Sequence, residues 1–362
     1  MRSGLIDRRA FMRAAGVTFL AALQPGRLMA LERADAIFAS GMRCSDGSFA
    51  VATVTERGEI VDRVALPARA HGMAFSKATG RTVAFARRPG TYAMIFDPQR
   101  RQEPIVITSP EGRHFYGHGA FSPDGRLLYA SENDFDGNRG MIGLYDATGR
   151  FARIGEYQTY GVGPHDMTVS DDGRFLVVAN GGIETHPDFG RAKLNLDDMQ
   201  PSLTLIEAAT GALVEKHVLP ARWSQVSTRH VDIDASGRIW FACQYEGHRG
   251  DQPPLVGFFG KGEDLTFVPL PEQTTRSLGN YVGAIAVNRR QGLVGVTSPV
   301  GGTAVTLDAR TGAVLEVRHV DDAAGIAAAA KGFAVSSYRG DFLGTHSDVA
   351  WDQHIVGIAA GG

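Results

Sequence analysis

The chain has 362 residues, of which 43% are hydrophobic and 21% are charged, and its formal net charge is −2. This composition is typical of a globular protein with a large core, and the near-neutral charge gives no support for nucleic-acid binding, which usually requires a basic surface. The 45 glycines indicate many turns and therefore many short strands.

The first segment is predicted to be an export signal rather than part of the fold. Residues 7–13, DRRAFMR, closely match the twin-arginine motif, with Asp7 where Ser or Thr is usual. The apolar stretch 14–23 that follows is too short to span a bilayer. We therefore predict a twin-arginine signal peptide over residues 1–30, one domain over residues 31–362, and a periplasmic protein with no membrane span after the signal is removed.

A repeated pattern begins at residue 71. Aligned copies are HGMAFSKATGR (71–81), HGAFSPDGR (118–126), HDMTVSDDGR (165–174), HVDIDASGR (230–238) and GAIAVNRRQG (283–292). Each copy is an apolar run that ends in a polar turn, and three further strand-like runs follow most copies. The anchor position of the repeat is occupied by Ser76, Ser122, Ser170, Asp234 and Asn288, separated by 46, 48, 64 and 54 residues. Four short strands in about 40 to 50 residues are typical of a β-propeller blade.

The repeat count predicts an all-β fold, a single β-propeller with seven blades of four antiparallel strands. A sixth copy begins near Gly325, and residues 35–67 contain three strand-like runs that precede the first complete copy. We expect these runs to share a seventh blade with the other end of the chain, which removes the exposed sheet edges. A different blade count is the alternative. The ring forms one domain because each blade packs against its neighbours.

Four histidines occupy similar positions in the repeat. In a propeller the first strand of each blade lines the central channel, so His71, His118, His165 and His230 are predicted to converge at one channel mouth. His71 and His165 lie five residues before their anchors, whereas the other two lie four before. Because successive side chains on a strand point in opposite directions, we expect two of the four to face the channel.

Histidine is the commonest metal ligand, and carboxylates extend such a site. The predicted transition-metal ligands, with iron or copper as the metal, are His71, His118, His165, His230, Glu132 and Glu246. Further candidates for the same mouth are Asn133, Asn180, His186, Arg229, Gln244, Tyr245, Asp352 and His354. Metal affinity is expected to fall below about pH 6.5, where an unperturbed imidazole becomes protonated. The alternative is a structural polar ring around ordered water.

Three more features bear on this mouth. Asp352 is predicted to orient His354 as a neighbouring partner. The insertion over residues 183–201, which carries Arg191 and Lys193, is long for a blade loop and could cover the mouth. Arg229, directly before a predicted ligand, could bind an anion or pair with a carboxylate.

The chain resembles a family of twin-arginine-exported seven-bladed propellers to which no activity is assigned. The resemblance rests on HGAFS with ASEND (118–134), GPHDM (163–167), ANGGIETHPDFGRAKLNLDDMQPSL (179–203), CQYEG (243–247) and WDQH (351–354), together with RHVDID and GNYVGAIAV. It implies a periplasmic role in iron acquisition. It also implies imelysin-like or haem-peroxidase-like proteins as partners, and it names no catalytic residue.

Two other classes of function stay open at this stage. Propeller lactonases hold a metal with Glu, Asn and Asp to polarise a carbonyl group, and Glu132, Asn180 and Glu246 are of suitable type. A protein-interaction platform is compatible with any propeller. Enzymatic activity is therefore uncertain, with a non-catalytic role favoured. The sequence contains no CxxCH haem-attachment motif, and it lacks the G-x-S-x-G motif of serine hydrolases.

Overall fold

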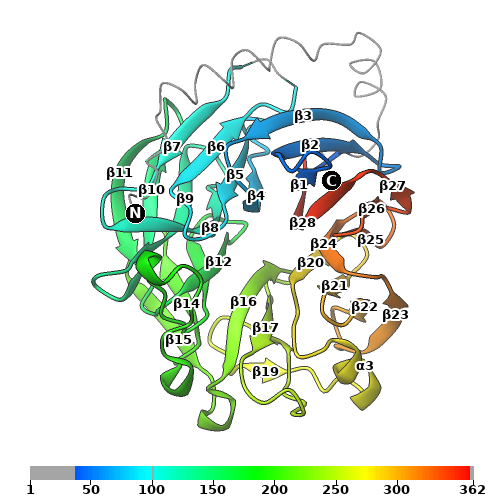
Figure 1. The fold of residues 1–362 in the computed structure, drawn as a ribbon. Coiled ribbons are helices and arrows are strands. Elements are labelled where there is room, and N and C mark those ends of the chain that lie inside the picture. Colours follow the sequence, from blue (N-terminus) through cyan, green and yellow to red (C-terminus); the bar gives the residue numbers. More distant parts are fainter. Residues whose placement is uncertain (1–36, 100–101, 359–362) are drawn as a thin grey trace.

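The computed structural model describes residues 37–99 and 102–358, so the predicted signal peptide lies outside the described residues. Within those ranges, seven four-stranded antiparallel sheets form a ring, as Figure 1 shows. This confirms the predicted all-β propeller, its seven blades and its four strands per blade.

The strands follow the chain blade by blade. Blade 1 contains β4 (Ala70–Phe75), β5 (Thr82–Ala86), β6 (Tyr92–Phe96) and β7 (Ile105–Thr108). Blade 2 contains β8 (Arg113–Phe121), β9 (Leu127–Asp134), β10 (Arg139–Asp146) and β11 (Ala152–Gln158). Blade 3 contains β12 (Pro164–Val169), β13 (Phe175–Asn180), β14 (Ser202–Glu207) and β15 (Leu213–Val218). Blade 4 contains β16 (Val226–Ile233), β17 (Ile239–Tyr245), β18 (Val256–Phe259) and β19 (Thr266–Phe267).

The remaining blades complete the ring. Blade 5 contains β20 (Ala284–Asn288), β21 (Leu293–Ser298), β22 (Thr303–Asp308) and β23 (Val314–His319). Blade 6 contains β24 (Ala323–Ala328), β25 (Phe333–Ser337), β26 (Asp341–Phe342) and β27 (Thr345–His346). Blade 7 contains β28 (Val349–Gly357), β1 (Ile37–Cys44), β2 (Phe49–Thr55) and β3 (Ile60–Leu66).

The helical segments of the described chain are short and lie in connections between strands. They are η1 (Pro187–Phe189), η2 (Leu196–Asp198), η3 (Ala221–Trp223) and α3 (Glu272–Ser277). Two of them, η1 and η2, belong to the insertion between β13 and β14. None of the helices in the described ranges combines the length and the hydropathy that crossing a membrane would require.

Blade 7 joins strands from both ends of the described chain, as predicted. The innermost strand β28 pairs antiparallel with β1, with Trp351 opposite Met42 and Gly357 opposite Phe38. Trp351 is fully buried, packs on Phe342, and donates its indole N–H to the Gly340 carbonyl at 3.1 Å. The seam of the ring is therefore a packed part of the core.

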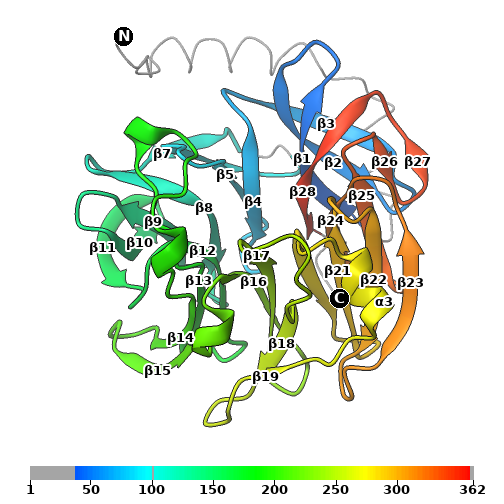
Figure 2. The ribbon, with the colours of Figure 1, turned by 60° about the horizontal axis from the view of Figure 1, so that its bottom comes forward.

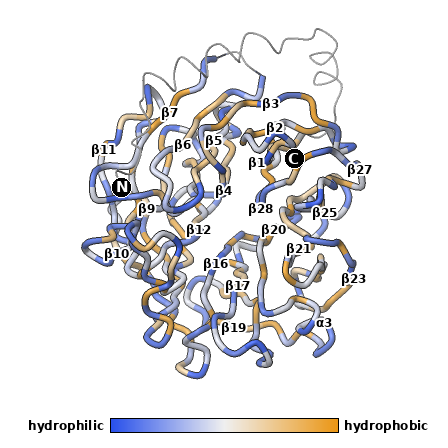
Figure 3. Tube along the Cα trace, viewed as in Figure 1, coloured by the Kyte–Doolittle hydropathy of each residue, from blue (hydrophilic) through white to orange (hydrophobic). Residues whose placement is uncertain are grey.

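Burial differs between the inner and outer strands of a blade. Strands β5 and β6 are buried on both faces, because the sheets on either side cover them. The outermost strand β11 instead alternates between exposed and half-buried residues. Figure 3 shows hydrophobic residues recurring along the strands, with hydrophilic residues more frequent in the connections. The inner strands therefore read as continuous apolar runs, and the core lies between adjacent blades.

Candidate metal centre

The histidines predicted from the repeat lie together in the central channel. They come from the innermost strands of adjacent blades, β4, β8, β12 and β16, and β28 adds His354. Figure 2 shows β4, β12 and β16 around the channel axis. Adjacent ring centroids are close: 4.8 Å from His71 to His118, 4.9 Å from His165 to His230, and 4.6 Å from His118 to His354.

All four predicted histidines enter the channel, whereas the alternation of a regular strand led us to expect two. The reason is a register irregularity in each strand that carries one. His71, His118, His165 and His354 lie inside the irregular stretches, and His230 lies at the edge of another. An extra residue at such a bulge redirects the neighbouring side chains, so both repeat positions can face the axis.

The two repeat positions form two layers across the channel. The arginine-side layer contains the residues five before the anchors in blades 1, 3 and 4: His71, His165 and Arg229. The turn-side layer contains the residues four before the anchors in blades 2, 3 and 4, together with His354: His118, Asp166, His230 and His354. The first set lines a cavity of about 230 Å³, and the second lines one of about 580 Å³ among the turns between the first two strands of the blades.

Asp166, which the sequence analysis missed, connects two histidines of the turn-side layer. Its Oδ1 lies 3.0 Å from His118 Nδ1, and its Oδ2 lies 3.5 Å from His230 Nδ1. Its Oδ2 also accepts the Val231 N–H of the next blade at 3.2 Å. A carboxylate only accepts hydrogen bonds, so each imidazole presents a protonated Nδ1 to Asp166 and turns Nε2 away from it.

Two imidazole nitrogens of the turn-side layer lack a hydrogen-bond partner within the described chain. The Nε2 atoms of His118 and His354 are buried and have no hydrogen-bond partner among the described residues. The histidines form two triplets, His71–His118–His354 and His118–His165–His230. Within each triplet, one ring nitrogen of every histidine lies within 4.8 Å of one ring nitrogen of each of the other two. A buried imidazole nitrogen held from behind by a carboxylate is the arrangement usual for a metal-ligating histidine.

His165 is less suited to ligation. Arg229 Nη1 lies 3.2 Å from His165 Nδ1, and a guanidinium can only donate. The lone pair of Nδ1 is therefore occupied and the proton of the neutral ring sits on Nε2. The structure thus separates His165 chemically from His118 and His230, with which it had been grouped as a predicted metal ligand.

Burial keeps the histidines neutral. Burial, followed by the neighbouring histidines, sets the pKa of His71 and His354 well below the usual value. Burial also lowers the pKa of His230 to about 4, against the opposing effect of Asp166. Burial alone would raise the pKa of Asp166, but His118 and His230 outweigh it and hold that pKa below its usual range. The turn-side layer therefore combines the neutral imidazoles of His230 and His354 with one carboxylate, the protonation states that metal binding requires.

Glu132, a predicted ligand, lies away from the histidines. It is fully buried within blade 2, where it accepts hydrogen bonds from Tyr145 at 2.8 Å and from Arg153 Nη2 at 2.9 Å. These partners lie on the third and fourth strands, so the side chain points toward the outside of the ring. The prediction placed Glu132 correctly at the end of a second strand but not its side chain.

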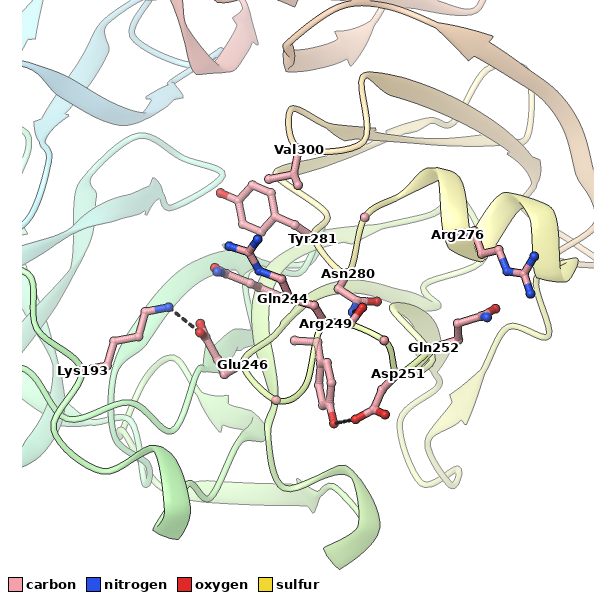
Figure 4. A pocket seen from close by; sticks show the side chains of 14 residues that line it. Lys193, Gln244, Glu246, Arg249, Asp251, Gln252, Arg276, Asn280, Tyr281 and Val300 are labelled. Atoms are coloured by element: carbon pink, nitrogen blue, oxygen red, sulfur yellow. Dashed lines mark hydrogen bonds and ion pairs between the residues drawn. The ribbon is translucent and has the colours of Figure 1, made fainter.

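Glu246 and Arg229 form an ion pair next to the arginine-side layer. Arg229 Nη2 donates to Glu246 Oε1 at 3.2 Å, and Lys193 from the insertion contacts the other oxygen of Glu246. Figure 4 shows Lys193 and Glu246 pointing toward each other. Gln244 lines this mouth, whereas Tyr245 donates to Asp251 at 2.7 Å. Glu246 is thus engaged by two cations rather than by the histidines.

The remaining candidates have local partners. Asn133 donates to the Thr185 carbonyl at 3.0 Å, and Asn180 donates to the Thr159 carbonyl at 3.1 Å. The rings of His186 and Phe135 lie in contact, with centroids 5.0 Å apart. The geometry of Asp352 differs from the prediction that it orients His354, because its Oδ1 accepts from Arg69 Nε at 2.6 Å.

The fold and the channel define the protein as a seven-bladed β-propeller with a histidine cluster in its channel. Residues 64–358 match the family model described as "Protein of unknown function (DUF1513)", and the chain belongs to that family. No curated protein was found to match the sequence.

Solved structures support the fold alone. Kuenenia stuttgartiensis Hydrazine Synthase has a TM-score of 0.59 and 16% identity, over 82% of this chain and 91% of that chain. The Myceliophteria thermophila Cps50 (Swd1) β-propeller domain has a TM-score of 0.59 and 11% identity, over 83% and 89%. The Nidogen/Laminin complex has a TM-score of 0.53 and 11% identity, over 90% and 98%.

Proposed function

We propose that the protein is a periplasmic metal-binding propeller that holds iron or copper at the turn-side layer and serves metal acquisition. The observation that carries the proposal is the pair of buried, unpartnered Nε2 atoms of His118 and His354, with His118 oriented by Asp166. Imidazole nitrogens suit copper, iron, zinc and nickel. The choice of iron or copper, and of imelysin-like or haem-peroxidase-like partners, comes from the family resemblance.

A lactonase-like site has less support. Its three proposed ligands would be Glu132, Asn180 and Glu246, and each of them is engaged by a different set of neighbours. The histidine-rich layer differs from the Glu, Asn and Asp shell with an open position that lactonase-like hydrolysis would require, and it suits the binding of a redox-active metal. The propeller fold also fits a protein-interaction platform, which is compatible with delivery of metal to a partner.

The first prediction concerns metal binding and its pH dependence. Chelator-treated protein is titrated by calorimetry with Cu²⁺, Zn²⁺, Ni²⁺, Mn²⁺ and, without oxygen, Fe²⁺. We expect the affinity for copper or iron to fall less steeply between pH 7.0 and pH 5.5 than it would with unperturbed imidazoles, because burial lowers the pKa of His230 to about 4 and sets the pKa of His354 well below its usual value. Two unperturbed imidazoles would together lower the affinity by about 70-fold over the same interval. This revises the expectation from the sequence that metal affinity falls below about pH 6.5, the pKa of an unperturbed histidine.

The same shifts set the sign of the stability change. The unfolded chain binds protons at these histidines below about pH 6.5, whereas folded His230 does so only near pH 4. Folding therefore weakens as the pH falls through this window, and circular dichroism at pH 5.5 verifies that the protein is folded during the titration. If none of these ions binds at pH 7.0, the metal proposal fails and a structural polar ring is preferred.

The periplasmic location is a proposal of its own. It rests on the twin-arginine motif at Arg8 and Arg9. Replacing both arginines with lysine should retain the protein in the cytoplasm, because the paired arginines are the feature that the translocation receptor reads. Cell fractionation followed by immunoblotting measures this, and unchanged periplasmic delivery would refute the assignment.

A further inference from the structure

A cavity of about 230 Å³ on the insertion face of the propeller is lined by five cationic side chains. They come from the end of β5, from the insertion and from β16, and they are Arg87, Arg88, Arg191, Lys193 and Arg229. We call this space the arginine cavity. It shares Lys193, Gln244 and Tyr281 with a wider cavity of about 740 Å³ on the same face, drawn in Figure 4.

The positive charge of the arginine cavity is only partly compensated. Glu246 accepts from both Lys193 and Arg229. Among the described residues, Arg87, Arg88 and Arg191 form no ion pair with a carboxylate. Within the part of the chain that the structure describes, the donors Arg88 Nη1 and Arg229 Nε are also buried without a hydrogen-bond partner. Both of these side chains are more than nine-tenths buried. Buried charged donors without acceptors are costly, which indicates that an anion completes the cavity.

The mutual repulsion of the cations is consistent with this. Burial, followed by Arg87 and Arg88, lowers the pKa of Arg191 to about 10. Burial is also the main reason that the pKa values of Arg87 and Arg88 are lowered. All three guanidinium groups keep their charge at neutral pH, so the repulsion persists until a negative charge enters.

The cationic groups are held in place before any ligand binds. The Arg88 guanidinium lies over the Tyr116 ring, with its carbon 5.6 Å from the centroid. Arg229 is fixed by Glu246 and His165. The insertion is anchored by Asn195, whose side chain donates to the Gly182 carbonyl at 2.9 Å and accepts the Glu184 N–H at 2.7 Å. Such preorganisation reduces the entropy cost of binding.

We propose that the arginine cavity binds a small oxyanion that carries at least two negative charges. Guanidinium groups match carboxylate and phosphate oxygens with paired hydrogen bonds, and the volume restricts the ligand to a small molecule. The site uses residues other than the turn-side layer, so it does not depend on the proposed metal.

The test uses chelator-treated, metal-free protein with citrate, oxalate, phosphate and sulfate, titrated separately by calorimetry in a low-chloride buffer. We expect the parent to bind at least one of them and Arg88→Gln or Arg191→Gln to reduce that affinity by about tenfold or more, since each removes charged hydrogen-bond donors. Preference for citrate or oxalate over phosphate by more than about tenfold assigns a carboxylate ligand, and the reverse assigns a phosphate ligand.

Arg249→Gln is the matched control, because Arg249 lines the wider cavity on the same face but not the arginine cavity. Its affinity for the anion should stay within about twofold of the parent. Absence of binding by all four anions at millimolar concentration overturns the proposal, as does an equal effect of Arg249→Gln and Arg191→Gln, which would indicate general attraction by surface charge. Thermal melts verify that each variant is folded. Because no metal is present, failure here leaves the metal-binding proposal standing.

Discussion

The double variant His118→Ala, His354→Ala is expected to bind copper or iron at least about 100-fold more weakly than the parent, because it removes both unpartnered Nε2 atoms. Loss of a partner behind a ligand typically costs 10- to 100-fold in metal affinity, and loss of two ligands should exceed that. The Asp166→Asn variant keeps all the histidines but removes the carboxylate that contacts His118 and His230. Its metal affinity should be lower than that of the parent by about 10- to 100-fold. Competition titration against a chelator of known affinity measures all three proteins.

The matched control is His186→Ala. His186 is a histidine of the insertion, and its ring contacts Phe135 and Phe189 rather than the channel cluster. Its metal affinity should equal that of the parent. Parent-like binding by a correctly folded double variant would show that the metal lies elsewhere, and a weakened His186→Ala variant would move the site to the insertion.

Glu132→Ala is expected to destabilise the protein by about 3 kcal/mol, since it leaves the Arg153 guanidinium and the Tyr145 hydroxyl without their buried acceptor. Glu132 has no exposed surface, whereas the Arg153 side chain is 26% exposed. In the variant, Arg153 can therefore gain hydration and keep its contact with Glu156, so the expected destabilisation is at the low end of the range for a broken buried ion pair. Urea unfolding, followed by circular dichroism, measures the change.

Glu156→Ala provides the comparison, because Glu156 contacts the same Arg153 but has a side chain that is 37% exposed. Exposed ion pairs contribute about 0 to 1 kcal/mol, so this variant should unfold close to the parent. A Glu132→Ala protein as stable as Glu156→Ala would show that the buried pair contributes little, and Glu132 would then be free for another role.

The repeat could be read from the sequence because turns and apolar runs recur at fixed offsets. The anchors at Ser122 and Ser170 are such turn residues, since each side-chain oxygen accepts the backbone N–H five residues on, at 3.0 and 2.9 Å. This local chemistry depends little on the rest of the fold. The blade count and the shared seventh blade followed from it.

The site was harder to predict because side-chain direction depends on the bulges. A bulge adds one residue to one strand, and no single residue type marks it. The alignment nevertheless contained a signal for Asp166, which occupies the same position four before the anchor as His118 and His230. Only the histidines were interpreted, so the carboxylate between them was missed. Glu132 was wrongly grouped with the histidines because the end of a strand does not determine which neighbour its side chain faces.

Because His354 lies on β28, the histidine cluster of the channel is complete only when this strand has joined the ring. This strand follows blades 1 to 6 along the chain, yet its ring lies within 4.9 Å of His71, His118 and His230, centroid to centroid. A polypeptide that has formed those six blades still lacks one donor, so the full donor set exists only after β28 has docked beside β1. A ligand selective for the finished set would stabilise the ring at its seam by about 2.7 kcal/mol at a concentration 100 times its dissociation constant. Binding of such a ligand would then favour the closed seven-bladed ring over a chain in which β28 has not yet docked beside β1.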